Sequence, residues 1–365
     1  MSSLVAHVQN CGDAKNLEIV GIEMVRSDDS RFPVKIREVR EGNSKIIAVT
    51  MYHPNVDELV KKAENIGSVE KTLGPLIGQY RKIIKSEKPD VVLLNGTYYL
   101  PWCLFLAAKN FSQKIVLHYH GSLTKETEHY PPAMRQIFHK MEKTFDSDKV
   151  RYIFPSILAK NTVSREVFNH EPKNFCVLSN SIPLHFFDAI KKRSGFKKSI
   201  GVVSRWCRVK NSGFIEKLAS YNSSLIKGFA FNLLTDLKFV ANFPDNIRRT
   251  VKLAKPMDNS RLGRFYSKMD VVICPSHFET YGNVAQESLA SGIPALVSSN
   301  MGIAEIFRQF GLEKWITAFN SPASVFDKIK QTSEETVNSE LRQELKNELN
   351  PSRVHGILLN YLKKS

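Results

Sequence analysis

The chain has 365 residues, of which 42% are hydrophobic and 24% are charged, and its formal net charge is +16. This composition is that of a globular protein and excludes disordered and fibrous classes, and the length predicts two domains. The positive charge favours polyanionic partners, namely nucleic acids, anionic membrane surfaces or phosphorylated small molecules, without choosing among them.

Neither a secretion signal nor a membrane-spanning segment is predicted. The first residues lack a basic region followed by an apolar run. The longest apolar stretch, 98–108, is about half the roughly 20 residues that a spanning helix needs. The five cysteines are far apart and odd in number, which favours reduced thiols over a disulfide framework or a zinc site. We therefore expect a cytoplasmic protein.

Short apolar runs bounded by turn residues predict buried parallel strands. They lie at 91–94, 115–117, 152–154, 200–203, 271–274 and 295–297. Helical segments separate them, and Leu76, Tyr80 and Ile84 share one face of a helix predicted over 73–84, which ends before Pro89. This alternation predicts a doubly wound α/β architecture whose ligands bind beyond the carboxyl ends of the strands.

The domain boundary is predicted between two strand signals. The segment 182–199 carries a proline, a glycine and clustered Lys and Arg residues, and we interpret it as a linker between domains at 1–185 and 198–350. The final segment, 351–365, is predicted as an amphipathic helix that can return to cover an apolar surface of the first domain.

Several common signatures are absent from the sequence. It contains no motif of P-loop NTPases, Rossmann dehydrogenases, zinc metalloproteases or α/β-hydrolases. Asp146 and Asp148 form an Asp-x-Asp that could chelate a divalent cation, but they lie in a polar turn before a strand, which favours a solvated turn. No RNA-binding or zinc-finger pattern accompanies the basic charge, so we expect no nucleic-acid partner.

The most informative stretch is 271–298, which combines a buried strand, a polar loop, a helix, a Gly-Ile-Pro turn and a second buried strand. Gly282 would let the backbone come close to a ligand. The amide groups at the start of the helix, near Asn283 and Val284, would face a diphosphate. This segment therefore predicts an anion site at a strand's carboxyl end.

Charged side chains surround that predicted anion site. Glu287, along the helix, can accept hydrogen bonds from ribose hydroxyls, and Glu279, in the loop, can accept from a sugar hydroxyl. Another strand, at 200–203, runs into a basic loop in which Arg205 and Lys210 can neutralise a leaving diphosphate. Such charges also occur on ordinary surfaces, and the surrounding pattern favours the functional interpretation.

These motifs resemble those of glycosyltransferase family 4, the retaining GT-B enzymes. The resemblance rests on the Glu279 and Glu287 pair followed by Leu-Ala-Ser-Gly-Ile-Pro, and on the Arg205 and Lys210 pair. Weaker similarity extends over 88–94, 116–121 and 177–182. The resemblance implies an α/β fold of the GT-B type, with two Rossmann-like domains facing a central cleft.

The resemblance also implies a role for each charged residue. Arg205 and Lys210 would bind the donor phosphates, Glu287 the ribose and Glu279 the transferred sugar. The family is metal-independent and retaining, with departure and attack on the same face of the sugar.

A histidine completes the implied site. His120 matches the family's histidine that looks across the cleft at the donor sugar. His118 lies two residues away and would share its strand face, so spacing does not choose between them.

The sequence departs from the family at two places. Family members usually open with a strand, a glycine-rich loop and a helix. Here the residues Leu4 to Val8, before Gly12, have two interpretations. They can be the end of that helix, followed by a strand at 17–22, in which case the first strand and its loop are missing. Alternatively, they form the first strand, and the helix is missing. The segment 229–236 also lacks the usual glycine pair, and the base pocket near 254–257 identifies no particular nucleotide.

We therefore predict a hexosyltransferase-type glycosyltransferase (EC 2.4) with His120 and Glu279 as catalytic residues. It would move a sugar from a nucleotide diphosphate sugar to a saccharide or lipid-linked acceptor, with retention and with no metal or other cofactor. The positive charge adds an expectation of peripheral docking to an anionic inner membrane face. The alternative is a non-catalytic GT-B subunit that binds a glycan or protein partner.

Overall fold

The computed structural model describes residues 17–188, 198–225, 228–236, 243–255 and 257–364. The predicted opening segment at Leu4 to Val8 and most of the predicted linker, 189–197, lie outside these ranges. The described chain forms two compact units. The first holds 17–154, 160–178 and 354–364, and the second holds 155–159 and 179–353.

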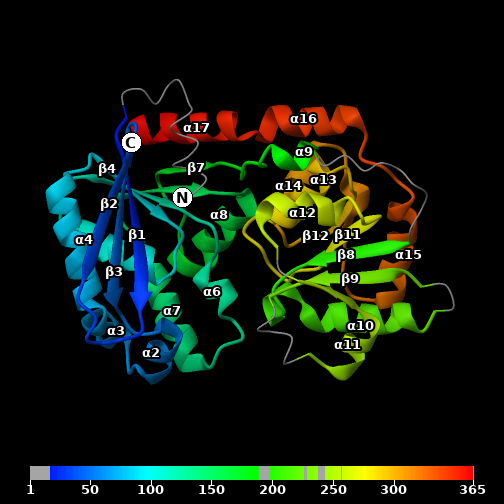
Figure 1. Ribbon diagram of the computed structural model, residues 1–365, viewed down its shortest axis with the longest axis horizontal. Coiled ribbons are helices and arrows are strands. Elements are labelled where there is room, and N and C mark those ends of the chain that lie inside the picture. The colour runs from blue at the N-terminus through cyan, green and yellow to red at the C-terminus, as the bar shows by residue number, and fades with distance from the viewer. Residues whose placement is uncertain (1–16, 189–197, 226–227, 237–242, 256, 365) are drawn as a thin grey trace. The chain divides into compact units, whose positions relative to one another are not determined.

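The first unit is built on a parallel four-stranded sheet in the order β4-β5-β6-β7 (Figure 1). Its strands are β4 (Val91–Asn95), β5 (Lys114–His118), β6 (Val150–Phe154) and β7 (Phe175–Val177). The strands predicted at 91–94, 115–117 and 152–154 all lie in this sheet. Adjacent strands pair in register, so that Asn95 at the end of β4 lies opposite His118 at the end of β5.

The helices of this unit include the predicted amphipathic one. They are α2 (Val56–Lys62), α3 (Ile66–Thr72), α4 (Gly74–Glu87), α5 (Tyr99–Ala108), α6 (Leu123–Glu126), α7 (Pro132–Lys143) and α8 (Ile157–Val163), which begins in the second unit and runs into a π-helical turn, Ser164–Phe168. The helix predicted over 73–84 is α4. It buries Leu76, Tyr80 and Ile84 and ends at Lys88, which has a left-handed backbone with φ of 46°.

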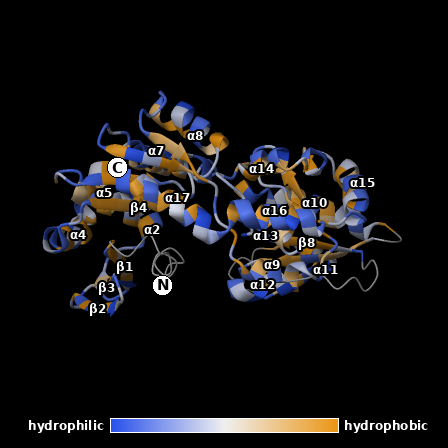
Figure 2. Ribbon diagram, turned by 90° about the horizontal axis from the view of Figure 1, so that it is seen from above, coloured by the Kyte–Doolittle hydropathy of each residue, from blue (hydrophilic) through white to orange (hydrophobic). Residues whose placement is uncertain are grey.

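The longest apolar stretch forms α5, whose residues Trp102, Cys103 and Phe105 are buried in the core. Figure 2 colours α5 and β4 largely hydrophobic. Among the residues that the structure describes, no helix is long and apolar enough to cross a membrane.

The last helix, α17 (Pro351–Lys364), packs on the sheet of the first unit. Val354 and Leu358 are buried there against Val116, Ile153 and Leu178. The apolar face of α17 is therefore buried against the sheet, as the sequence predicted.

A second, separate sheet of the first unit was largely missed by the sequence analysis. It has the order β1-β3-β2, with β1 (Ile19–Ser27) parallel to β3 (Ser44–Tyr52) and β2 (Lys35–Glu41) antiparallel to β3. The strand predicted at 17–22 is the first half of β1. The buried hydrophobic side chains of β3 are Ile47, Val49 and Met51.

The second unit is built on a six-stranded, all-parallel sheet in the order β10-β9-β8-β11-β12-β13. Its strands are β8 (Ser199–Val203), β9 (Ala230–Leu234), β10 (Lys252–Ala254), β11 (Val271–Cys274), β12 (Ala295–Ser298) and β13 (Ile316–Thr317). The strands predicted at 200–203, 271–274 and 295–297 are β8, β11 and β12. Because β8, β9 and β11 are neighbours, the segments that follow them meet at one edge.

Helices cover both faces of this sheet, with α10 and α11 on one side and α12, α13 and α14 on the other (Figure 1). The helices of the unit are α9 (His185–Asp188), α10 (Ser212–Ser223), α11 (Asp245–Thr250), α12 (Asn259–Tyr266), α13 (Asn283–Ala290), α14 (Ile303–Gln309), α15 (Pro322–Ser333) and α16 (Ser339–Leu349). The predicted linker therefore contains α9 and the start of β8, and the longer segment of the second unit begins at Ser179, before the predicted linker.

The Asp-x-Asp turn lies between α7 and β6. Asp146 bonds with His170 at 2.9 Å, and Asp148 pairs with Lys173 at 3.4 Å. Within the described ranges, no group of three or more His, Cys, Asp or Glu side chains is placed to hold a metal ion.

Candidate functional site

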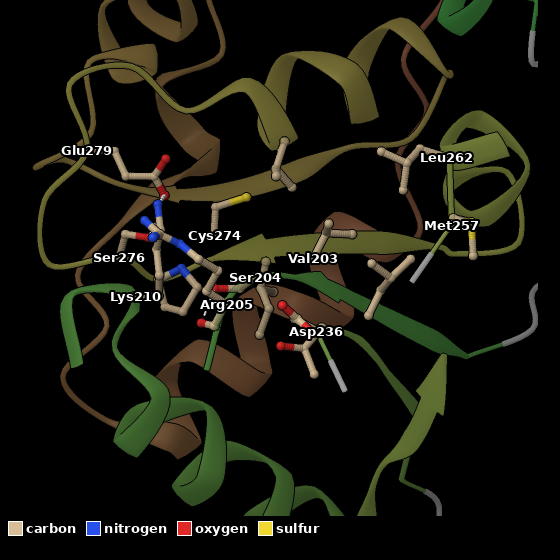
Figure 3. Close-up of a pocket in the computed structure, with 15 residues that line it drawn as sticks. Val203, Ser204, Arg205, Lys210, Asp236, Met257, Leu262, Cys274, Ser276 and Glu279 are labelled. Carbon is tan, nitrogen blue, oxygen red and sulfur yellow. Dashed lines mark hydrogen bonds and ion pairs between the residues drawn. The ribbon is translucent and has the colours of Figure 1, made fainter. Parts of the chain in front are cut away.

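A pocket of about 560 Å³ lies at the carboxyl ends of the strands of the second unit (Figure 3). Its walls come from the ends of β8, β9 and β11, from the segments that follow them, and from Met257, Leu262 and Val284. Both its position and its size are typical of small-molecule sites in open α/β sheets.

The loop after β8 is held against the loop after β11. Lys210 ends a 3-10 turn, and Asn211 follows with a left-handed backbone, φ of 57°. The buried Asn211 amide donates to the carbonyl of Pro275 at 3.0 Å. The backbone N–H of His277 donates to the carbonyl of Val209 at 2.9 Å. These two bonds bring residues more than sixty positions apart onto one wall.

A charged cluster occupies one end of the pocket. The Lys210 ammonium lies 3.0 Å from Oε1 of Glu279, and both side chains are 20% exposed. The Ser276 hydroxyl donates to the same oxygen at 2.6 Å. Figure 3 shows Arg205 beside this cluster, whereas Met257 and Leu262 lie toward the other end. The pocket thus has a cationic end and an apolar end.

Backbone bonds fix the loop that carries Glu279. Its N–H donates to the carbonyl of Asn300 at 3.2 Å, and its carbonyl accepts from the N–H of Gly302 at 3.0 Å. Hydrogen bonds from both its N–H and its carbonyl therefore fix the backbone position of Glu279.

Gly282 forms the N-cap of α13 with φ of 128°, a conformation that favours glycine. A Cβ there would lie 2.8 Å from Cε of Met301 and 2.9 Å from Cγ2 of Ile303. The backbone angle and the close packing both require glycine at this position, and the approach of a ligand to Gly282 stays a prediction. The side chain of Asn283 accepts from the amide of Asn180 at 2.8 Å.

Gly282→Ala should destabilise the protein by roughly 2–4 kcal/mol because it combines backbone strain with overpacking. Urea unfolding measures the change. Gly78→Ala is the matched control: it lies within α4 with open space around its Cα, and alanine there should stabilise by roughly 0.5–1 kcal/mol. Equal unfolding free energies for the two variants would contradict this explanation.

Glu287 lies on α13, one turn beyond Val284. Its Oε2 accepts from the Tyr266 hydroxyl at 2.8 Å. Burial raises the pKa of Glu287 to about 7, while the Tyr266 hydrogen bond acts in the opposite direction. An acceptor of this kind, with few competing waters, suits recognition of a hydroxyl.

His120 follows β5 in the first unit, and its ring bonds with the side chain of Asn95. The surrounding protein lowers the pKa of His120, so the imidazole is neutral at pH 7. His118 is different. Burial lowers its pKa to about 3, and its ring lies 4.2 Å from that of His120. His120 is the more exposed of the two.

The eight residues predicted for the site fall into three groups. The pocket itself is lined by Arg205, Lys210, Glu279 and Val284. Gly282, Asn283 and Glu287 lie on the same loop and helix without lining it. His120 belongs to the first unit.

The sequence analysis missed several polar residues that line the pocket. Ser276 lies two residues past the end of β11, and Thr235 and Asp236 come directly after β9. Polar side chains just past a strand's carboxyl end were the available signal. Met257 follows β10 in the segment expected to hold the base.

Sequence comparison finds known proteins that are similar to part of this chain. The profile of the family described as Glycosyl transferases group 1 matches residues 245–349. An uncharacterized glycosyltransferase of Methanocaldococcus jannaschii is 28% identical over 192 residues. That alignment covers 47% of this chain and 47% of the relative, so the chain matches about half of the relative's length.

Solved structures share the fold over almost the whole chain. A sucrose-phosphate synthase of Thermosynechococcus elongatus has a TM-score of 0.74 at 14% identity and covers 99% of this chain and 91% of its own. A UDP-forming α,α-trehalose-phosphate synthase of Burkholderia xenovorans, in complex with glucose-6-phosphate, has a TM-score of 0.69 at 11% identity, with coverage of 100% and 96%. The chain therefore has the α/β fold of GT-B glycosyltransferases, and its residues 245–349 match the profile of glycosyl transferases group 1.

Proposed function

We propose that this protein is a glycosyltransferase that takes a sugar from a nucleotide diphosphate sugar. The observation that carries the proposal is the pocket at the strand ends of the second unit, where Lys210 and Arg205 stand beside Glu279 at one end and apolar side chains line the other. The groups of a nucleotide sugar are arranged in a matching order: a doubly charged diphosphate lies between a hydroxyl-rich sugar at one end and a flat base at the other.

In this proposal the cations act on the leaving group. When the bond between the anomeric carbon and the diphosphate oxygen breaks, the electron pair leaves with the diphosphate; the acceptor hydroxyl oxygen bonds to the same carbon, and its proton passes to the leaving diphosphate. Arg205 can meet the developing charge with parallel N–H donors, and Lys210 can do so as a compact charge. Two cations suffice in principle for a step without a metal, which is how we propose that the reaction runs.

The carboxylates would hold hydroxyls. Glu279 would accept from the transferred sugar, since its bonds to Lys210 and Ser276 already place it at the cationic end. Glu287 would accept from the ribose, and the amides that begin α13 at Asn283 would favour the diphosphate. We further propose retention, a saccharide or lipid-linked acceptor, and His120 as a catalytic residue.

The similar proteins support the class of donor and acceptor. The Burkholderia structure is described as UDP-forming and in complex with a sugar phosphate, which makes a nucleotide sugar and a sugar acceptor the natural pair to test here.

The test has two stages. A thermal-shift series with UDP, GDP, ADP and CDP should show at least one that raises the melting temperature in a concentration-dependent way, because a ligand that binds only the native state stabilises it. Release of that nucleotide from its glucose, mannose and galactose conjugates, with and without added oligosaccharide, then measures transfer. The absence of any shift at millimolar nucleotide would refute the proposed function.

A further inference from the structure

The sheet order arranges the pocket in a line. Successive neighbouring strands are β11, β8, β9 and β10, spaced about 4.8 Å apart. Glu279 follows β11, Arg205 follows β8, Asp236 follows β9 and Met257 follows β10, and all four line the same pocket. A donor whose sugar lies at Glu279 and whose diphosphate lies at Arg205 would therefore place its nucleoside at Asp236 and Met257.

Thr235 has a polar atom without a partner at this position. Its side chain is 4% exposed and lines the pocket. Its hydroxyl finds no hydrogen-bond partner among the residues that the structure describes. Leaving a buried hydroxyl unpaired is unfavourable, so such a group in a pocket wall points to a ligand that completes its bonding.

Asp236, next in the chain, is exposed in the same pocket and offers two acceptor oxygens. The bases differ in the hydrogen-bond donors that they can present to a carboxylate. Guanine presents two adjacent donors, N1–H and N2–H₂, beside the O6 acceptor. Uracil presents one donor between two acceptors, while adenine and cytosine each present an amino group beside a ring-nitrogen acceptor. Only guanine can meet both carboxylate oxygens without placing an acceptor against one of them.

We propose that Thr235 and Asp236 select a guanine nucleotide, so that the donor is a GDP-sugar. Asp236 accepts from N1–H and N2–H₂, and the Thr235 hydroxyl donates to O6. Met257 and Leu262 supply an apolar wall against which the flat ring packs. This inference rests on the proposed function, whose donor class it narrows.

Titration calorimetry of the full chain with GDP, UDP, ADP and CDP tests the inference. The wild type should bind GDP at least about tenfold more tightly than the other three, the discrimination that a good paired contact to a base edge gives. Asp236→Asn, which replaces an acceptor by a donor, should weaken GDP about tenfold and leave UDP within twofold. Asp327→Asn, an exposed change on α15, is the control and should alter neither.

A second variant separates ligand binding from folding. Thr235→Val keeps the shape of the side chain and removes the unpaired hydroxyl. The melting temperature of the free protein should stay equal or rise, while the affinity for GDP falls several-fold. Loss of GDP affinity without loss of stability is a result that a structural role would not give.

The outcomes distinguish the two proposals. If no nucleoside diphosphate binds, the proposed function itself is wrong. If nucleotides bind with equal affinity, or if Asp236→Asn weakens all four by the same factor, the function stands and the guanine assignment is overturned, because the carboxylate then acts on a part that all nucleotides share.

Discussion

Lys210→Ala should lower kcat/KM for sugar transfer by about 10²- to 10³-fold, the usual effect of removing a preorganised group that stabilises charge in the transition state. Two effects add. The leaving diphosphate loses a cation, and Glu279, whose carboxylate Lys210 now pairs at 3.0 Å, is left as an uncompensated negative charge beside it. Steady-state kinetics with the donor that the wild type uses measures the loss.

Two further variants separate charge from shape. Lys210→Met keeps most of the side-chain volume and should lose nearly as much activity as alanine. Lys217→Ala removes an exposed lysine of α10 that does not line the pocket and should leave kcat/KM unchanged. Activity within about twofold of the wild type in Lys210→Met would show that the ammonium has no part in the reaction.

The buried strands could be predicted because strands that are buried on both faces have a recognisable sequence pattern. In β8 and β11 nearly every side chain is buried, so the sequence shows a short continuous apolar run. The loop after β11 could also be predicted, because Gly282 and the helix that follows it form a local sequence pattern.

The small sheet was harder to predict because it has little to bury. The strand β2 is exposed along its described length, and its sequence, Lys-Ile-Arg-Glu-Val-Arg-Glu, resembles a solvated charged segment. Gly42, with φ of 55° between β2 and β3, was the one clear signal of a hairpin.

The composition of the pocket depended on strand order, which a single sequence does not encode locally. Lys210 and Glu279 meet only because β8 and β11 are neighbours, and Thr235 joins them only because β9 lies on the other side of β8. The sequence indicated that Arg205 and Lys210 follow one buried strand and that Glu279 follows another, but it could not say which end of a pocket each would occupy.

Glu287→Gln should stabilise the protein at pH 8 and at the same time weaken binding of the nucleotide donor. Burial raises the pKa of Glu287 to about 7, from the usual value of 4.5. The folded state therefore holds its proton between about pH 4.5 and 7, where the unfolded chain has lost it. The stability that Glu287 contributes is complete below pH 4.5, falls as the pH rises through this window, and is lost above 7.

Glutamine has no charge to bury, so it avoids this loss. The gain at pH 8 should be on the order of 3 kcal/mol, because each unit of the pKa difference corresponds to about 1.4 kcal/mol, and it should vanish near pH 4.5. Thermal unfolding at both pH values measures it. The ionised carboxylate is also the stronger acceptor for ribose, so the variant should bind the nucleoside diphosphate about 10- to 100-fold more weakly at pH 8.

Glu142→Gln in the first unit is the matched control, because burial also raises the pKa of Glu142 to about 7. Its Oε2 accepts from the N–H of Thr124 and the hydroxyl of Ser122, while Oε1 has no partner among the described residues, so a glutamine can keep both bonds. This variant should repeat the gain in stability at pH 8 and leave nucleotide affinity unchanged. We expect Glu287→Gln to raise stability and weaken nucleotide binding, whereas Glu142→Gln should raise stability alone. This difference would separate ligand recognition from the general cost of a buried carboxylate. Weaker binding in both variants, or in neither, would contradict the role proposed for Glu287.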